Sequence, residues 1–178
     1  AISTPGAHQI FISSLIDAFV AKFDSNGNKI WATYYGGTND DYGLSLAIQD
    51  SINNVYVSGK TASNNGIVTS GAFIDTVAPF GVFHGFLVKF NNNGLRVWGT
   101  YIGQSKYGTF YNESANGVTV DKLGNAYVVG NVSSTTSVSN QYATSHQTVY
   151  GGGSSDGFIF KITANGSRSW SSLFGGNQ

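Results

Sequence analysis

The sequence is poor in charged residues and contains no cysteine. Nine acidic and nine basic residues make up 10% of the 178 residues, so the formal net charge is zero. This balance provides no basic surface for nucleic acid or for an anionic membrane. Without cysteine, disulfides, thiolate nucleophiles and cysteine-ligated metals are excluded. No apolar run approaches about 18 residues, so we expect no insertion into a membrane.

Proline is also scarce, at two residues, and nothing in the composition favours a long helix. Glycine, in contrast, is abundant at 24 residues, and 14% of the chain is aromatic. Glycine supplies the positive φ that tight hairpin turns require, and aromatic residues favour strands. The composition therefore predicts an all-β protein with many short strands.

One stretch of the sequence occurs three times. Its copies are DAFVAKFDSNGNKIWATYYGG at 17–37, HGFLVKFNNNGLRVWGTYIGQ at 84–104 and DGFIFKITANGSRSWSSLFGG at 156–176. The three tryptophans of the chain share one position in it, at spacings of 67 and 72 residues, and such self-similarity signals a repeat architecture. Each copy has two strand-like runs around an Asn-Gly pair, which predicts a tight β-hairpin.

A second pair of strand-like runs lies between these copies. GLSLAIQD at 43–50 precedes NVYVSGKT at 54–61, and NGVTVD at 116–121 precedes NAYVVGN at 125–131. A complete repeat is thus four antiparallel strands in about 70 residues, somewhat longer than familiar propeller blades. Apolar residues on both sides of the strands require cover on both faces, and neighbouring blades of a β-propeller provide it. We predict the outer hairpin of one blade at 17–37 and two blades at 43–104 and 115–176.

The repeated stretch, together with the hairpin that follows it and the TSGAF loop at 69–73, resembles the SBBP beta-propeller repeats of secreted Bacteroidetes proteins. NGVTVDKLGNAYVVG has a weaker likeness to NHL-type propeller repeats. This second likeness implies a strand order within the blade. The runs at 43–50 and 116–121 would be innermost, 54–61 second, 17–23 third and 29–35 outermost. The resemblance implies a secreted or cell-surface bacterial protein.

Ten predicted strands amount to two and a half blades. Propellers close with about four to eight blades, so this number cannot close a ring. We therefore expect the rest of a longer propeller chain as a partner. Assembly of several copies into one ring is the alternative.

The predicted strand order makes the connections unequal. The connections at 62–83 and 132–155 between second and third strands are long, and they emerge on the same face as the connections between blades. Long loops in compact domains are usually functional, so we place a binding site for a glycan or a surface protein on this face. The candidates combine aromatic platforms with a carboxylate: Tyr42, Tyr107, Tyr111, Glu113, Tyr142 and Tyr150. The alternative is that these tyrosines pack the loops onto the rim of the propeller.

Metal and catalytic motifs are weakly represented. Asp40 and Asp41 are candidate cation ligands, whereas the turn at Asp24 lacks the rest of a calcium loop and its copies lose the Asp. H-E-x-x-H is absent, and Glu113 is the only glutamate. We expect no cofactor and no enzymatic activity. The three histidines, at 8, 84 and 146, are expected to be structural.

The family resemblance also implies a covalent modification. O-glycosylation in Bacteroidetes commonly falls on Ser or Thr between Asp and an aliphatic or small residue. Ser51 and Thr76 stand in such sequences. We interpret the chain as a non-catalytic propeller segment for adhesion or recognition. An accessory propeller of a secreted hydrolase and a scaffold in a surface or secretion complex are the alternatives.

Overall fold

A computed structural model describes residues 2–49, 52–77, 82–103, 112–133 and 146–176 of the chain. Within these ranges the protein contains ten β-strands and no helix. Their bounds are β1 Ala18–Phe23, β2 Lys29–Tyr35, β3 Asp41–Gln49, β4 Asn54–Thr61, β5 His84–Phe90, β6 Arg96–Ile102, β7 Glu113–Val120, β8 Ala126–Val132, β9 Asp156–Ile162 and β10 Arg168–Phe174.

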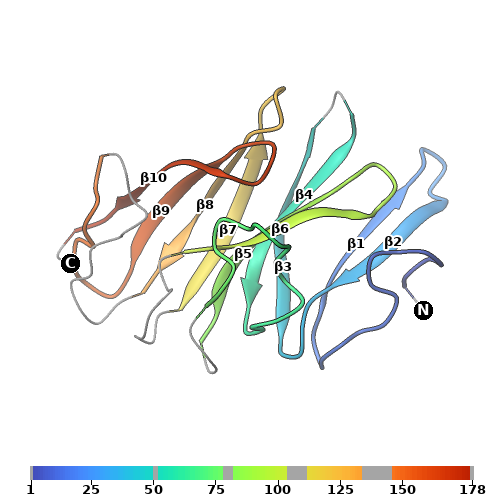
Figure 1. Ribbon diagram of the computed structural model, residues 1–178, viewed down its shortest axis with the longest axis horizontal. Helices are drawn as coiled ribbons and strands as arrows, with labels where there is room; N and C mark the ends of the chain where they lie inside the picture. The colour runs from blue at the N-terminus through green and yellow to red at the C-terminus, as the bar shows by residue number, and fades with distance from the viewer. Residues whose placement is uncertain (1, 50–51, 78–81, 104–111, 134–145, 177–178) are drawn as a thin grey trace.

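The strands form two complete blades and one outer hairpin. One sheet has the order β3-β4-β5-β6, another the order β10-β9-β8-β7, and β1 pairs with β2 in a third. Every neighbouring pair is antiparallel. The sheets follow one another across the molecule, with β1–β2 at one side and β9–β10 at the other (Figure 1). The four-stranded antiparallel blade and its strand order are confirmed, and the ring is not closed.

Strand bounds follow the predicted ones closely where the turn chemistry is strong. β2 and β4 have the expected bounds. β7, in contrast, begins at Glu113, earlier than the predicted run at 116–121. Glu113 pairs with Val132 on β8 and is 2% exposed, because the ladder continues past a β-bulge. Glu113 therefore lies in a buried strand end and not in the loop where the sequence analysis placed it.

The hydrophobic core is divided into two layers, each between neighbouring sheets. Alternate residues of β5 point to opposite faces, as in any strand. Phe86 and Phe90 pack with Val20 of β1 in one layer, whereas Leu87 packs with Phe160 of β9 in the other. Both phenylalanines are fully buried. Each blade therefore depends on its two neighbours for the burial of its apolar residues.

The tryptophans link each sheet to the hairpin turn of the next. The indole Nε1–H of Trp31 donates to the carbonyl of Asn92 at 2.9 Å, and that of Trp98 donates to the carbonyl of Ala164 at 3.0 Å. The ammonium of Lys89 donates to the same Ala164 carbonyl at 3.0 Å, and burial lowers the pKa of this lysine. The repeated tryptophan is thus an interblade tie as well as a core residue.

Part of each long connection runs along the outermost strand of its blade. The N–H of Thr69 donates to Gly99 at 3.0 Å, and the N–H of Tyr101 donates to Ile74 at 3.2 Å. The same contacts recur in the first sheet, where Thr4 donates to Ala32 at 2.9 Å. An outer strand has an unpaired edge, and these segments cover it. The long connections therefore have a structural role over part of their length.

Candidate functional site

The junctions between neighbouring sheets bring charged residues together on the face of the long connections. The third strand of each blade starts at or just after a residue that the repeat places at one position: Asp17, His84 and Asp156. The first strand of the following blade begins at Asp41 or at Glu113. Two such residues meet at each junction, one from either blade.

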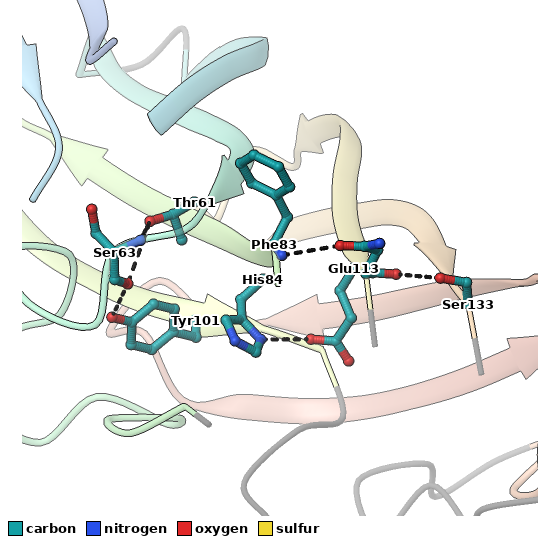
Figure 2. Close-up of polar contacts among 8 residues, drawn as sticks. Thr61, Ser63, Phe83, His84, Tyr101, Glu113 and Ser133 are labelled. Carbon is teal, nitrogen blue, oxygen red and sulfur yellow. Dashed lines mark hydrogen bonds and ion pairs between the residues drawn. The ribbon is translucent and has the colours of Figure 1, made fainter. Parts of the chain in front are cut away.

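At the junction of the second and third sheets the pair is His84 and Glu113. Nδ1 of His84 lies 3.5 Å from Oε2 of Glu113, and both side chains are almost completely buried. Figure 2 shows the histidine ring pointing at the carboxylate, with the ring of Tyr101 beside it at a centroid distance of 6.3 Å. Gly103 has φ +149°, and a Cβ there would lie 2.0 Å from Oε2. The site thus requires glycine at this position.

At the junction of the first and second sheets the pair is Asp17 and Asp41. Oδ2 of Asp17 accepts hydrogen bonds from Gln9 at 2.7 Å and from the N–H of Ser13 at 2.8 Å. Oδ2 of Asp41 accepts from the N–H of Gly37 at 2.7 Å. The two carboxylates lie close together. A Cβ at Gly36, the residue before Gly37, would lie within 3 Å of both side chains. One junction therefore holds a histidine beside a glutamate, and the other holds two acids.

Asp41 is the most perturbed acid of this junction. Asp41 is fully buried, and its Oδ1 has no hydrogen-bond partner in the described ranges. The nearby Thr61 hydroxyl lowers the pKa of this carboxyl, but the effect is smaller than that of burial. Burial is the largest effect and raises the pKa of Asp41 above 3.8, with the charge of Asp17 adding to the increase. Ionised Asp41 therefore destabilises the fold.

We expect Asp41→Asn to be more thermally stable than the wild type at pH 7. The folded pKa of Asp41 exceeds the unfolded one, so the destabilisation is present above the folded pKa and disappears as the pH falls toward 4. Thermal melts of both proteins between pH 4 and pH 8 should show the two stability curves converging at the acidic end. As a control, the exposed Asp75→Asn should leave the pH dependence unchanged. A constant difference between Asp41→Asn and wild type over this range would contradict the assignment.

Each junction opens into a groove on the long-connection face. The groove beside Asp41 is a cavity of about 600 Å³, and the groove beside Glu113 is one of about 560 Å³. Asp40 lines the first and Asn112 the second, each directly ahead of the buried acid. The other residues of the first are Ile12, Ser13, Ser14, Leu15, Thr38, Asn39 and Ala62. Those of the second are Lys60, Phe83, Glu113, Ser114 and Asn131.

Residues 97–134 match a family model described as SBBP, a beta-propeller repeat. This chain carries an SBBP beta-propeller repeat. The matched SBBP stretch begins in β6 and ends just beyond β8, so it includes Gly103, Glu113 and most of the second groove. A search of curated proteins found no match to the chain.

An aromatic and cationic cluster borders the groove that lies within the SBBP match. The rings of Tyr42 and Phe83 meet edge to face at 5.8 Å. Nζ of Lys60 lies 4.6 Å from the Phe83 ring centre and 5.0 Å from that of Tyr42. The carboxamide oxygen of Asn112 accepts a hydrogen bond from the N–H of Phe83 at 3.2 Å, which holds the two sides of the groove together.

The predicted binding residues have different positions in this SBBP-repeat structure. Tyr42 is partly buried beside the second groove, and Glu113 lines that groove from a buried position. Tyr150 is 5% exposed in the core, and its hydroxyl donates to the carbonyl of Gly153. The structure therefore gives Tyr150 a packing role, since its ring does not face solvent. The predicted residues Tyr107, Tyr111 and Tyr142 lie outside the described residues.

The remaining candidates concern metal binding and modification. Asp40 lines the first groove, whereas Asp41 is buried beneath it. In the described ranges, no group of three or more His, Asp or Glu side chains could hold a metal ion. Thr76 is exposed and its hydroxyl donates to the Asp75 carboxylate at 2.9 Å, while Ser51 lies outside the described residues. No helix in the described part of the chain is long and apolar enough to cross a membrane.

Two of the three histidines, His84 and His8, lie among packed side chains, and the third, His146, is exposed. His84 belongs to the buried pair. His8 packs between the rings of Tyr35 and Phe90, and burial lowers its pKa to about 4, with a contribution from Arg96. His146 is exposed and stacks on Phe174 at 5.3 Å.

Sequence reasoning missed several residues of the grooves. Lys60 and Asn131 lie near the ends of the repeated runs at 54–61 and 125–131, and Phe83 directly precedes β5. Their positions at strand ends could have indicated a role in the site, because the strand ends on one side of a blade lie at the same face of the molecule. Comparing the residues at the ends of the repeated runs would have identified them.

Proposed function

We propose that this SBBP-repeat chain is a non-catalytic recognition module that binds carbohydrate in the grooves at its blade junctions. The observation that carries the proposal is the recurrence of one groove at two junctions with different polar linings. A repeated frame with changing side chains suits recognition, since the fold holds the frame and the lining sets the specificity. The family resemblance of the repeats supports a secreted or cell-surface setting.

The chemistry of the linings favours sugars over apolar ligands. The first groove offers hydroxyl, amide and carboxylate groups from Ser13, Asn39 and Asp40. The second adds the Phe83 ring beside the carboxamide of Asn131. Sugars are bound by hydrogen bonds to their hydroxyl groups and by stacking of their C–H faces on aromatic rings. Both kinds of group are present at the second junction.

The same geometry argues for binding without catalysis. Glycoside hydrolysis needs two carboxyl groups on either side of the scissile bond. Glu113 is held against His84, and Asp41 is fully buried. Asp40 lines the first groove and is partly exposed. A single accessible carboxylate can orient a hydroxyl group but cannot supply both catalytic roles.

Glycan-array binding of the full chain tests this function. For a glycan that binds, we expect Asp40→Ala or Asn131→Ala to weaken the affinity by about tenfold, because a hydrogen bond to the sugar is lost. Asn26→Ala, an exposed change in a tight turn of the opposite face, is the matched control and should bind normally. Absence of binding to any glycan, or binding that survives both groove variants, would overturn the proposal. Release of reducing sugar from a bound glycan would overturn its non-catalytic part.

A further inference from the structure

The two grooves at the blade junctions offer hydrogen-bonding groups of opposite kinds. In the first groove the side-chain NH2 of Asn39 donates to the carbonyl of Ala62 at 3.2 Å. This bond uses a donor of the carboxamide and leaves its oxygen for a ligand. The partly exposed carboxylate of Asp40 follows Asn39 in the chain and lines the same groove. The first groove therefore presents acceptors and a negative charge.

In the second groove the internal hydrogen bonds use the acceptors instead. Oδ1 of Asn112 accepts from the N–H of Phe83 at 3.2 Å, and Oδ1 of Asn131 accepts from the side-chain NH2 of Asn116 at 2.8 Å. Both Asn112 and Asn131 line the groove, and each has an NH2 group of its own that can donate to a ligand. The second groove therefore presents donors.

Lys60 adds a positive charge to these donors. Its Nζ lies 4.6 Å from the ring centre of Phe83 and 5.0 Å from that of Tyr42, and the electron-rich faces of such rings attract a cation. Neither ring neutralises the ammonium, and no acid in the described part of the chain forms an ion pair with it. The side chain is partly exposed and lines the groove. Its charge is thus available to an anionic ligand.

The acid that lines the second groove is already engaged within the protein. Glu113 is 2% exposed, and its Oε2 lies 3.5 Å from Nδ1 of His84. Figure 2 shows the Phe83 ring on one side of the strand and the His84 ring, with the Glu113 carboxylate, on the other. The carboxylate of Glu113 therefore faces the histidine, whereas the ammonium of Lys60 lies against the Phe83 ring.

The charge of the second groove depends on one position of the repeat. Lys60 pairs with Gly85 and Asn131 pairs with Gly157, so the two residues have the same register in neighbouring blades. Both side chains line this groove, one from the second blade and one from the third. A substitution at this position changes the charge of the groove, while the backbone pairing of the strands does not depend on the side chain.

We propose that the second groove binds an acidic sugar and that Lys60 sets this specificity. The inference rests on the carbohydrate recognition proposed above and names the class of sugar for this groove. Lys60 and the two amide NH2 groups bind the carboxylate or sulfate of the sugar, since hydrogen bonds between charged groups are stronger than neutral ones. The sugar ring stacks on Phe83. The first groove disfavours the same ligand, because Asp40 repels its charge.

Pairs of oligosaccharides with and without the acidic group test this specificity. The array carries oligomers of galacturonate, glucuronate and mannuronate, each beside its methyl ester, and galactose oligomers with and without sulfate esters. We expect the full chain to bind at least one acidic form about tenfold more tightly than its neutral counterpart, which lacks the charged contact. A preference among the uronates identifies the bound group as a carboxylate, and one among the galactose oligomers identifies it as a sulfate.

Substitutions of two lysines assign the preference to the second groove. Lys60→Gln should reduce it to less than about twofold, whereas Lys60→Arg should retain it because the charge is kept. Lys122→Gln is the matched control, since it removes the same charge from an exposed lysine in the turn after β7, at the opposite end of that strand from Glu113. This control should keep the full preference. Added salt should weaken the binding of acidic forms more than that of neutral ones, because salt screens charge.

Three results would reject the acidic-sugar assignment while leaving carbohydrate recognition intact. They are equal binding of every acidic form and its neutral counterpart, a preference that persists in Lys60→Gln, and an equal loss of preference in Lys122→Gln. The first comparison uses the wild-type chain, so it does not depend on the folding of a variant. Absence of binding to any sugar, acidic or neutral, would instead reject the recognition function on which this inference rests.

Discussion

Trp98→Ala is expected to lower the free energy of unfolding by about 3–5 kcal/mol. Trp98 is 8% exposed and packs with Tyr56 in the layer between the second and third sheets. Its indole N–H donates to Ala164, and its ring lies against Gly166, where a Cβ would be 3.1 Å away. The substitution leaves a cavity between two blades and removes the hydrogen bond to the next turn. Urea unfolding followed by circular dichroism would measure the loss.

Trp170→Ala is the matched control for this change. Trp170 has the same position in the third copy of the repeat, but it lies in the last sheet and is only partly buried. We expect a smaller loss of about 1–2 kcal/mol, because less apolar surface is withdrawn from water there. Trp98→Phe also reduces the buried area and removes the indole N–H. We expect the missing hydrogen bond to lower the free energy of unfolding by about 1 kcal/mol beyond the effect of the smaller area. Equal losses for Trp98→Ala and Trp170→Ala would contradict the interblade role of this position.

Glu113→Ala is expected to destabilise the fold by about 1–3 kcal/mol, the usual cost of leaving a buried polar group without its partner. Its carboxylate lies 3.5 Å from His84, and neither ring nitrogen of His84 has a hydrogen-bond partner among the described residues. The single substitution leaves the histidine buried opposite an apolar cavity. Chemical unfolding at pH 7 would measure the effect. The exposed Asp75→Ala should change stability by less than about 0.5 kcal/mol.

A double-mutant cycle isolates the contribution of the pair itself. We expect His84→Ala and Glu113→Ala together to cost less than the sum of the single changes, by about 1 kcal/mol or more. The reason is that removing both groups leaves neither side chain of the pair buried without the other. Strict additivity would show that the two side chains stabilise the fold separately and that the junction is not a coupled site.

The hairpins and their order within a blade were predictable because their signals are local. An Asn-Gly pair between two alternating runs specifies a tight turn and antiparallel pairing without reference to the rest of the chain. The bounds of β2 and β4 therefore agree with the structure. The repeat then extends each local inference to its copies.

The candidate site was less predictable because it depends on contacts between blades. His84 was seen in the sequence as a departure from the leading Asp of the repeat. The structure shows that its partner also changes, from Asp41 to Glu113, so the substitution has a neighbour that accommodates it. Tyr150 was chosen for its residue type and proved to be buried. Residue type alone does not say which face of the chain meets solvent.

The long connections show the same limit. Their length suggested a binding role for the whole of 62–83, yet Thr69 and Ile74 are hydrogen-bonded along β6. The open outer edge that these residues cover exists only once the sheet has assembled. Alternation, glycine turns and the repeat period therefore specify each blade from its own residues. The paired residues at the junctions and the grooves come from the packing of one blade on the next, which brings together residues far apart in the sequence.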